Sequence, residues 1–511
     1  MLAVPALGTL AAAAAMLVCT GSVVFTTRSE PVSTVSYETP RPVTLSAPMD
    51  VDADNAEVMA EPASGDGFVD PGVHGWVDAA RDGLSTFSVD VDRGSYAFAR
   101  RQLREGRLPD PRGVRTEEFV NALAYDYPEP EGAPFSVHVE ASPAPRGDEL
   151  LVRIGLQGRH VTERRPVHLV FLVDTSGSMS GPDRLGLVKE ALRLLVGELG
   201  ADDTVAIVTY AGSSGVALPP TSAGDPRAIL AALDGLESGG STAMGAGIEL
   251  AYRLAGQTLA SGSTSRVILA SDGDANVGAT SLDALLELIR AQADRGVTLT
   301  TLGFGEGNFQ DFRMEQLADR GDGNYFYVDG LEEARHVFVD ELASTLEVIA
   351  RDVKVQVAWN AEAVQRYRLV GYENRAIADD DFRDDRVDAG EIGAGHTVTA
   401  LYEVVPQPGA VGPLATVRLR SEPPGAQGEA TERAYEVPRA AVQPSFAAAS
   451  PDHRMAVAVA LFAERLRASP HAEGWSYAAL ADLVAGAMRP GHPEDAEVLE
   501  LVRRAGALDP G

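Results

Sequence analysis

The chain has 511 residues, with 43 Lys and Arg against 74 Asp and Glu, and its formal net charge is −31 at pH 7. This charge argues against nucleic acid as a partner, because basic side chains that neutralise phosphates supply most of the affinity in such complexes. With 45% hydrophobic and 23% charged residues, the composition is that of a globular protein of several domains. The single cysteine, Cys19, excludes intrachain disulfides and cysteine-based zinc sites, so a bound metal would have oxygen or histidine ligands.

Residues 1–27 form an apolar segment with no charged side chain before Arg28. The segment is long enough for a secretory signal or for a membrane-spanning helix, although it lacks the basic residue expected at its start. A third interpretation is a lipoprotein signal with Cys19 as the lipid-bearing residue, although Val18 stands where a small residue is usual. All three interpretations predict export. The protein would be attached to the cell envelope through its N-terminus, or periplasmic or secreted if the segment is cleaved.

Residues 28–80 are rich in Pro, Ser, Ala and acidic residues and have no sustained hydrophobic periodicity. We expect a disordered linker, which as a coil would reach about 40 Å. Over residues 81–160 the pattern changes to a strand near Leu84, a helix that carries Tyr96 and Phe98, a second helix over 114–127, and two further strands. This part of the chain is therefore expected to form a small α+β module.

Two acidic residues in this part of the chain, Asp90 and Asp92, alternate with valines and would share one face of a strand. Carboxylates placed in this way can bind a cation. The alternative is that they are simply the solvated face of that strand.

An alternation of strands and helices begins at residue 165 and continues to residue 346. The first strand, His168–Val173, is an unbroken apolar run of the kind that is buried on both faces of a parallel sheet. Further strands are expected over 204–210, 266–270, 297–303 and 324–328, and helices over 185–199, 225–236, 243–254, 281–293 and 331–343. Strands separated by helices predict an α/β fold with an open, mostly parallel sheet and helices on both faces.

In such a sheet, ligands bind beyond the carboxyl ends of the strands, and three loops there carry oxygen ligands. The first strand ends in Asp174, Ser176 and Ser178, the 266–270 strand is followed by Asp272, and a Gly-Gly-Ser loop before a helix contains Thr242. Two carboxylates and three hydroxyl groups form a hard oxygen shell. Such a shell suits Mg²⁺ or Mn²⁺ better than zinc.

The Asp-x-Ser-x-Ser turn at Asp174, together with Thr242 and Asp272, resembles the metal-ion-dependent adhesion site of von Willebrand factor type A domains. The resemblance implies that Ser176 and Ser178 coordinate Mg²⁺, Mn²⁺ or Ca²⁺ directly, and that Asp174 and Asp272 do so directly or through water. Thr242 would be a direct ligand in one state and bridged by water in another. A Glu or Asp carboxylate of a partner protein would complete the coordination, and movement of Thr242 and Asp272 could tilt the helix over 331–343.

Longer segments of the chain resemble a smaller family of proteins that contain a type A domain. Among them are VDVDRGSYAFARRQLREGRLP, STAMGAGIELAY, LASDGDANVG and YRLVGYENRAIADDDFRDD, which look like the bacterial YfbK-type proteins. This resemblance covers roughly residues 80–511 and implies an N-terminal module, a central type A domain and a C-terminal domain behind an export or lipoprotein signal.

The C-terminal domain is expected over residues 347–511, first β-rich and then helical from about residue 451. Strands are predicted over 353–358, 396–405 and 415–420. Between the first two lies an acidic loop, Asp379–Asp385, which could hold Ca²⁺ but is more often simply solvated in such sequences. His396 is expected to be structural.

The sequence does not favour an enzyme, because it has no GxSxG, HExxH or Walker motif and its nine His do not cluster at ligand spacing. Two function classes remain. The favoured one is a protein of the cell envelope that binds a partner protein through a divalent cation. The other is an assembly or chaperone-like subunit that works with a partner complex such as an ATPase. The apolar N-terminal segment favours the first.

Overall fold

A computed structural model describes residues 72–89, 92–161, 165–259, 262–273, 281–305, 311–340, 346–387, 389–424 and 429–509, which belong to one compact unit. The expected N-terminal signal or anchor lies outside these ranges, as does most of the expected linker. In the described part of the chain, no helix is long and apolar enough to cross a membrane.

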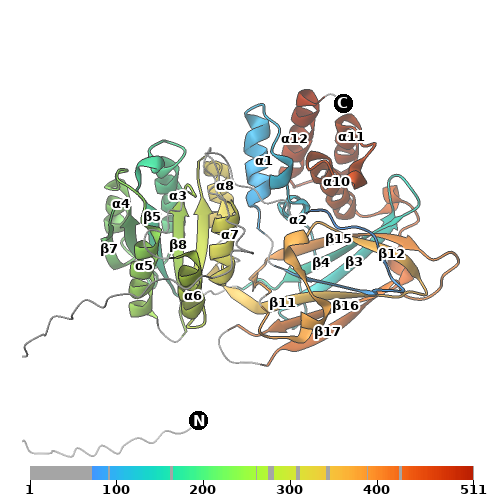
Figure 1. Ribbon diagram of the computed structural model, residues 1–511, viewed down its shortest axis with the longest axis horizontal. Helices are drawn as coiled ribbons and strands as arrows, with labels where there is room; N and C mark the ends of the chain where they lie inside the picture. Colours follow the sequence, from blue (N-terminus) through green and yellow to red (C-terminus); the bar gives the residue numbers. More distant parts are fainter. Residues whose placement is uncertain are drawn as a thin grey trace, which may run out of the picture. The chain divides into compact units, whose positions relative to one another are not determined.

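The central sheet has six strands in the order β10-β9-β8-β5-β6-β7 (Figure 1). All neighbouring strands are parallel except β7, which pairs antiparallel with β6 at one edge. The strands are β5 Val167–Asp174, β6 Thr204–Tyr210, β7 Ser214–Ser222, β8 Thr264–Ser271, β9 Val297–Gly303 and β10 Tyr325–Tyr327. Because parallel neighbours leave their carboxyl ends at one edge of the sheet, Asp174 and the residues after β8 lie at the same edge.

Helices cover both faces of this sheet, as Figure 1 shows, and thereby bury its apolar strands. In β5, Leu169, Phe171 and Val173 pack on one side, whereas Val170 and Leu172 pack on the other. The first side is covered by α3 Leu185–Gly197, α4 Arg227–Asp234 and α8 Leu331–Arg335, and the second by α5 Met244–Thr258, α6 Leu282–Ala293 and α7 Asp311–Arg320. The fold class is therefore the expected α/β class, with helices on both faces.

The remaining strands form two further sheets that share one hydrophobic core. The first has the order β1-β12-β15-β4-β3, with β1 Val77–Asp78, β3 Phe135–Pro143, β4 Leu150–Gly158, β12 Val364–Val370 and β15 Thr397–Pro406. The second has the order β13-β2-β11-β16-β17, and β14 Ile392–Gly393 pairs with β11. Its strands are β2 Leu84–Ser88, β11 Val348–Trp359, β13 Ala376–Ile377, β16 Ala415–Glu422 and β17 Thr431–Val437. Each sheet thus combines strands from before and after the central sheet in sequence.

A helical cluster is assembled in the same way from distant segments. It contains α1 Gly94–Arg104 and α2 Thr116–Asn121, which pack with α10 Pro451–Leu466, α11 Tyr477–Ala487 and α12 Glu494–Leu508. Two of the terminal helices begin at serine caps, Ser450 and Ser476, whose side chains accept backbone hydrogen bonds in the first turn.

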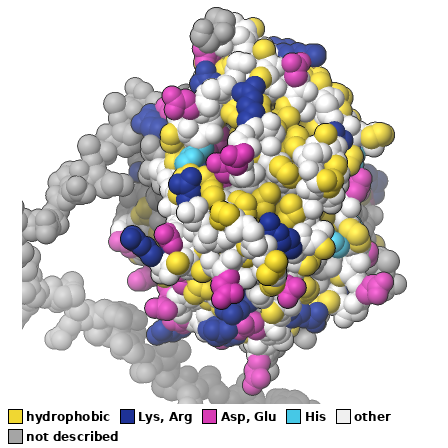
Figure 2. All heavy atoms as spheres, turned by 90° about the vertical axis from the view of Figure 1, so that its right-hand side faces the viewer, with side chains coloured by type: hydrophobic (Ala, Val, Ile, Leu, Met, Phe, Trp, Pro, Cys, Tyr) yellow, Lys and Arg dark blue, Asp and Glu magenta, His cyan; other side chains and the backbone are white. Residues whose placement is uncertain are grey.

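On the face that the two shared sheets and the terminal helices present, basic and acidic side chains are interspersed (Figure 2). The net negative charge of the chain is therefore not gathered into one acidic patch on this face.

Some expected elements differ in the structure. The helix expected over 114–127 is shorter, since α2 spans only Thr116–Asn121, and the closing helix is α-helical only to Arg335 and continues as a π-helical turn over His336–Asp340. Strands β7, β12 and β17 and helix α7 were not expected. Asp92 does not lie on an exposed strand face, because β2 ends at Ser88 and the buried Asp92 carboxylate pairs with Arg375. Asp90 lies outside the described residues.

Candidate metal centre

The turn that follows β5 holds its carboxylate in a fixed position. Asp174 is fully buried, its Oδ1 accepts a hydrogen bond from the Ser176 backbone N–H at 2.8 Å, and its Oδ2 accepts one from the Ser271 hydroxyl at 3.0 Å. The first of these bonds closes the turn locally, as Asp side chains commonly do. The second connects the end of β5 to the end of its parallel neighbour β8.

The hydroxyl groups of the same turn lie close together, with the Ser176 and Ser178 Oγ atoms 3.0 Å apart. The loop that contains Thr242 is attached to this turn by two backbone hydrogen bonds, from Gly177 N to Gly240 O at 3.0 Å and from Gly239 N to Thr175 O at 2.7 Å. Thr242 itself is half-buried. The structure therefore brings the loop of Thr242 against the turn of Asp174.

Asp272 follows β8 directly and is 2% exposed. The next residue, Gly273, has φ +79°, a left-handed conformation that favours glycine, and its N–H donates to the Ser271 hydroxyl at 3.1 Å. Ser271 thus connects the turn after β8 to Asp174, because its hydroxyl also donates to the Asp174 carboxylate at 3.0 Å. Asp274, which follows in the sequence, lies outside the described residues.

Two buried carboxylates at one edge of a sheet repel one another. Burial raises the pKa of Asp174, and the charge of Asp272 raises it further, whereas the hydrogen bonds from Ser176 and Ser271 act in the opposite direction. Burial also raises the pKa of the neighbouring Tyr210 well above its ordinary value, with a further contribution from Asp174. A cation placed between these carboxylates would relieve the repulsion.

The basic side chain of Arg184, which the sequence analysis missed, already relieves part of the repulsion between the two carboxylates. The Arg184 Nη1 atom donates to Asp272 Oδ2 at 3.1 Å and also to the backbone carbonyl oxygen of Ser178. Arg184 stands just before α3, ten residues after Asp174, and only the fold shows that its side chain reaches Asp272. Its single positive charge offsets one of the two carboxylate charges.

The donor set of this edge fits a hard divalent cation. It consists of carboxylate and hydroxyl oxygens, the ligands that Mg²⁺, Mn²⁺ and Ca²⁺ prefer, and it contains neither sulfur nor imidazole. The hydrogen bonds join Asp174, Ser176 and Ser178 to one another, and Ser271 connects them to the β8 end that carries Asp272.

A second acidic group was expected in the loop over 379–385. There, Asp385 lies with Asp352 and Glu422 so that one carboxylate oxygen of each lies within 4.8 Å of the others. Basic side chains pair with two of its three carboxylates, because Lys354 Nζ donates to Asp352 at 2.9 Å and Arg420 pairs with Asp385 at 2.6 Å. We therefore interpret it as an ion-paired surface cluster.

Comparisons with known proteins identify the family of the chain. The family model of the von Willebrand factor type A domain matches residues 168–341, and a further von Willebrand factor model matches residues 64–153. The model of the C-terminal part of YfbK matches residues 344–411 and 410–508. Uncharacterized protein YfbK of Escherichia coli K12 is 39% identical over 428 residues, which are 78% of this chain and 73% of that protein. The chain belongs to the YfbK family.

Other similarities are shorter or lower in sequence identity. The magnesium-chelatase 60 kDa subunit of Rhodobacter capsulatus is 32% identical over 142 residues, 26% of this chain and 24% of that protein. Among solved structures, a von Willebrand factor type A protein from Catenulispora acidiphila matches 72% of this chain and 89% of its own, with 18% identity and a TM-score of 0.44. No family model that matches this YfbK-family chain is named for an enzymatic activity. Type A domains commonly mediate protein interactions and often bind a divalent metal ion.

Proposed function

We propose that this protein binds a partner protein through a divalent cation held by Asp174, Ser176, Ser178, Thr242 and Asp272, and that it is not an enzyme. The observation that carries the proposal is the meeting of two buried carboxylates and a pair of serine hydroxyls 3.0 Å apart at one edge of the sheet. Mg²⁺ is the expected cation, and Mn²⁺ or Ca²⁺ would suit the same oxygen ligands.

A partner carboxylate fits this site for an electrostatic reason. Hydroxyl ligands are neutral, so a cation held mainly by them keeps much of its positive charge. Mg²⁺ also requires a nearly complete octahedron of oxygens, which leaves a position for an oxygen from outside the chain. An Asp or Glu side chain of a partner would supply that oxygen together with a negative charge.

Capture of a partner tests this function. The full chain is immobilised and exposed to proteins of the cell envelope in Mg²⁺ or in EDTA, and the bound proteins are identified. We expect a partner that is retained in Mg²⁺, released by EDTA, and lost when Thr242 is replaced by Ala. A partner retained equally in EDTA and by Thr242→Ala would place the binding surface elsewhere and contradict the proposal.

Removing the positive charge of Arg184 is expected to strengthen cation binding. In Arg184→Met, Asp272 loses the guanidinium group that hydrogen-bonds to it at 3.1 Å, so the cation no longer competes with that group for the carboxylate. We expect the Kd for Mg²⁺ to fall about 3- to 30-fold in calorimetric titration of the full chain, equivalent to about 0.7–2 kcal/mol. A weaker affinity would instead identify Arg184 as a support that holds Asp272 in place.

We also propose that the chain is exported and attached to the cell envelope through its N-terminal segment. If Cys19 carries a lipid, Cys19→Ala should move the protein from the membrane to the soluble fraction after cell fractionation. The same distribution for wild type and variant would favour a spanning helix as the anchor. Wild-type protein found only in the soluble fraction would mean that the segment is cleaved without lipidation.

The alternative function is an assembly subunit that acts with a partner complex such as an ATPase. The similarity to the magnesium-chelatase 60 kDa subunit over 26% of this chain favours it. The two functions differ in the compartment of the partner, so the identity of the captured protein decides between them.

A further inference from the structure

A cavity of about 320 Å³ lies where three parts of the chain meet. Residues 121–125 at the end of α2 form one wall, residues 393–397 form another, and Arg266, Asn324 and Phe326 line it from the central sheet. This volume is within the range of small-molecule sites, about 300–1,000 Å³. The wall is mixed, since Leu123 and Phe326 contribute apolar surface beside polar and charged groups.

Arg266, at the start of β8, is the unusual residue of this cavity. It is 1% exposed, its Nη1 donates to the Thr300 hydroxyl at 2.7 Å, and its buried Nε has no hydrogen-bond partner in the described part of the chain. No ion pair joins its guanidinium to a carboxylate of the described residues, although the Glu391 charge is near enough to affect it. Burial lowers the pKa of Arg266 to about 10, so the side chain remains charged at neutral pH. A buried charge without a counter-ion is costly, which makes an external anion favourable here.

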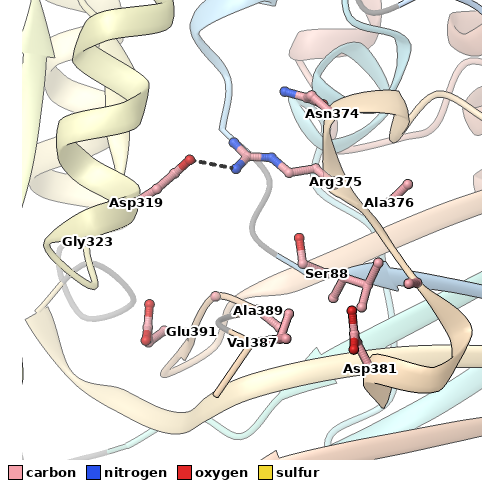
Figure 3. Close-up of a pocket in the computed structure, with 13 residues that line it drawn as sticks. Ser88, Asp319, Gly323, Asn374, Arg375, Ala376, Asp381, Val387, Ala389 and Glu391 are labelled. Atoms are coloured by element: carbon pink, nitrogen blue, oxygen red, sulfur yellow. Dashed lines mark hydrogen bonds and ion pairs between the residues drawn. The ribbon is translucent and has the colours of Figure 1, made fainter. Parts of the chain in front are cut away.

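A neighbouring cavity provides a comparison, because it also contains a buried arginine. There, Arg375 points toward Asp319, as Figure 3 shows, and it also pairs with Asp92 and Glu315 at 2.7 Å. This guanidinium is fully compensated by the protein itself. These carboxylates therefore disfavour the binding of an anion at Arg375. Arg266 differs from Arg375 because no such ion pair joins it to a carboxylate of the described residues.

Two carboxylates in the wall of this cavity pair with arginines that lie outside it, and Arg93, Asp340 and Glu391 also line the wall. Asp92 pairs with Arg375, and Asp322 pairs with Arg290 at 3.1 Å and with Arg351 at 3.0 Å. Thr298 is the partner of Arg266 across the β8–β9 pair, on the same face of the sheet, but it does not line the cavity. Its buried Oγ1 has no hydrogen-bond partner among the described residues. The guanidinium of Arg266, which does line the cavity, offers donors to one anionic group.

We propose that this cavity binds a small organic monocarboxylate, with its carboxylate at Arg266 and its apolar part against Leu123 and Phe326. A single negative charge balances the guanidinium of Arg266. A dianion such as phosphate would add a second charge near Glu391, which disfavours it. The site is separate from the proposed metal centre, because Arg266 and Asp272 are six residues apart along one strand, about 20 Å.

Thermal unfolding of the full chain tests this proposal with acetate, butyrate and inorganic phosphate, each compared with NaCl at equal ionic strength in EDTA. We expect butyrate to raise the Tm by about 2–4 °C, acetate to raise it less, and phosphate to leave it unchanged. EDTA keeps the outcome independent of cation binding. No rise with either carboxylate would overturn the proposal, and an equal rise with phosphate would overturn the monocarboxylate assignment.

Two variants assign the effect to Arg266. Arg266→Met removes the buried charge, so we expect an equal or higher Tm in NaCl and no rise with butyrate. Arg266→Lys keeps the charge but loses the planar guanidinium group that can bind both oxygens of a carboxylate. We therefore expect butyrate to raise the Tm of this variant less than that of wild type. The matched control is Arg227→Met, at an exposed arginine, which should respond like wild type. A wild-type response in either Arg266→Met or Arg266→Lys would show that the carboxylate binds elsewhere.

Discussion

Asp174→Asn is expected to abolish cation binding while the fold survives, with an affinity for Mg²⁺ at least about 100-fold lower than that of wild type. The change removes one of the two buried carboxylates of the candidate centre. The amide oxygen of Asn can still accept the hydrogen bond from Ser176 N, and the Ser271 hydroxyl can rotate to accept one from the amide nitrogen. Calorimetric titration of Mg²⁺, Mn²⁺ and Ca²⁺ into the full chain measures the effect.

The fold of this variant should be as stable as that of metal-free wild type, or slightly more so. Burial and Asp272 both raise the pKa of Asp174, which means that its charged form is disfavoured in the folded protein without a cation. The control is Asp225→Asn, which changes an exposed Asp paired with Arg227 and should bind cations like wild type. Wild-type cation affinity in Asp174→Asn would rule out the site proposed here.

The central sheet could be predicted because its strands are short, apolar and separated by amphipathic helices. The run His168–Val173 and the strands at 204–210 and 297–303 are found almost to the residue, since both faces of a parallel strand must be apolar. Because parallel strands leave their carboxyl ends at one edge of the sheet, Asp174 and Asp272 could be predicted to lie at the same edge. The edge strand β7 was missed because its residues are mostly half-buried or exposed and include two prolines, Pro219 and Pro220, which are typical of edge strands.

The other two sheets could not be predicted, because their order depends on contacts between residues far apart in the chain. Strand β2 pairs with β11, so that Phe87 lies beside Val355, and β4 pairs with β15, so that Val152 lies beside Tyr402. Nothing in the local pattern of β2 or β4 indicates such partners. Arg184 was missed for a related reason, since its contact with Asp272 spans 88 residues.

The segments before and after the central sheet are also joined to it by buried ion pairs. Arg375, which follows β12, is 8% exposed and binds Asp92 before α1 and Glu315 and Asp319 on α7. Glu315 also pairs with Arg115 at 3.1 Å, and Asp92 also accepts a hydrogen bond from Tyr325 N at 2.9 Å. One guanidinium therefore holds three distant segments together.

Arg375→Met is expected to cause the largest loss of stability, about 3–5 kcal/mol in the free energy of unfolding. The variant leaves the carboxylates of Asp92 and Glu315 buried without this counter-charge, which costs more than the pair itself contributes. Urea denaturation of the full chain, followed by circular dichroism, measures the loss. The control is Arg386→Met, because Arg386 is 89% exposed and its pair with Asp384, screened by water, should contribute little to stability.

The shape of the unfolding curve carries further information about the role of Arg375. A lower midpoint with the same slope would mean that the central sheet and the shared sheets still unfold as one unit. Two separate transitions in the variant would mean that Arg375 and its partners supply the coupling between them. A curve identical to that of wild type would contradict the argument, because the buried carboxylates would then have found other counter-charges. Since β2 and β4 lie within sheets completed by later strands, we expect the shared sheets to remain one unit in either case.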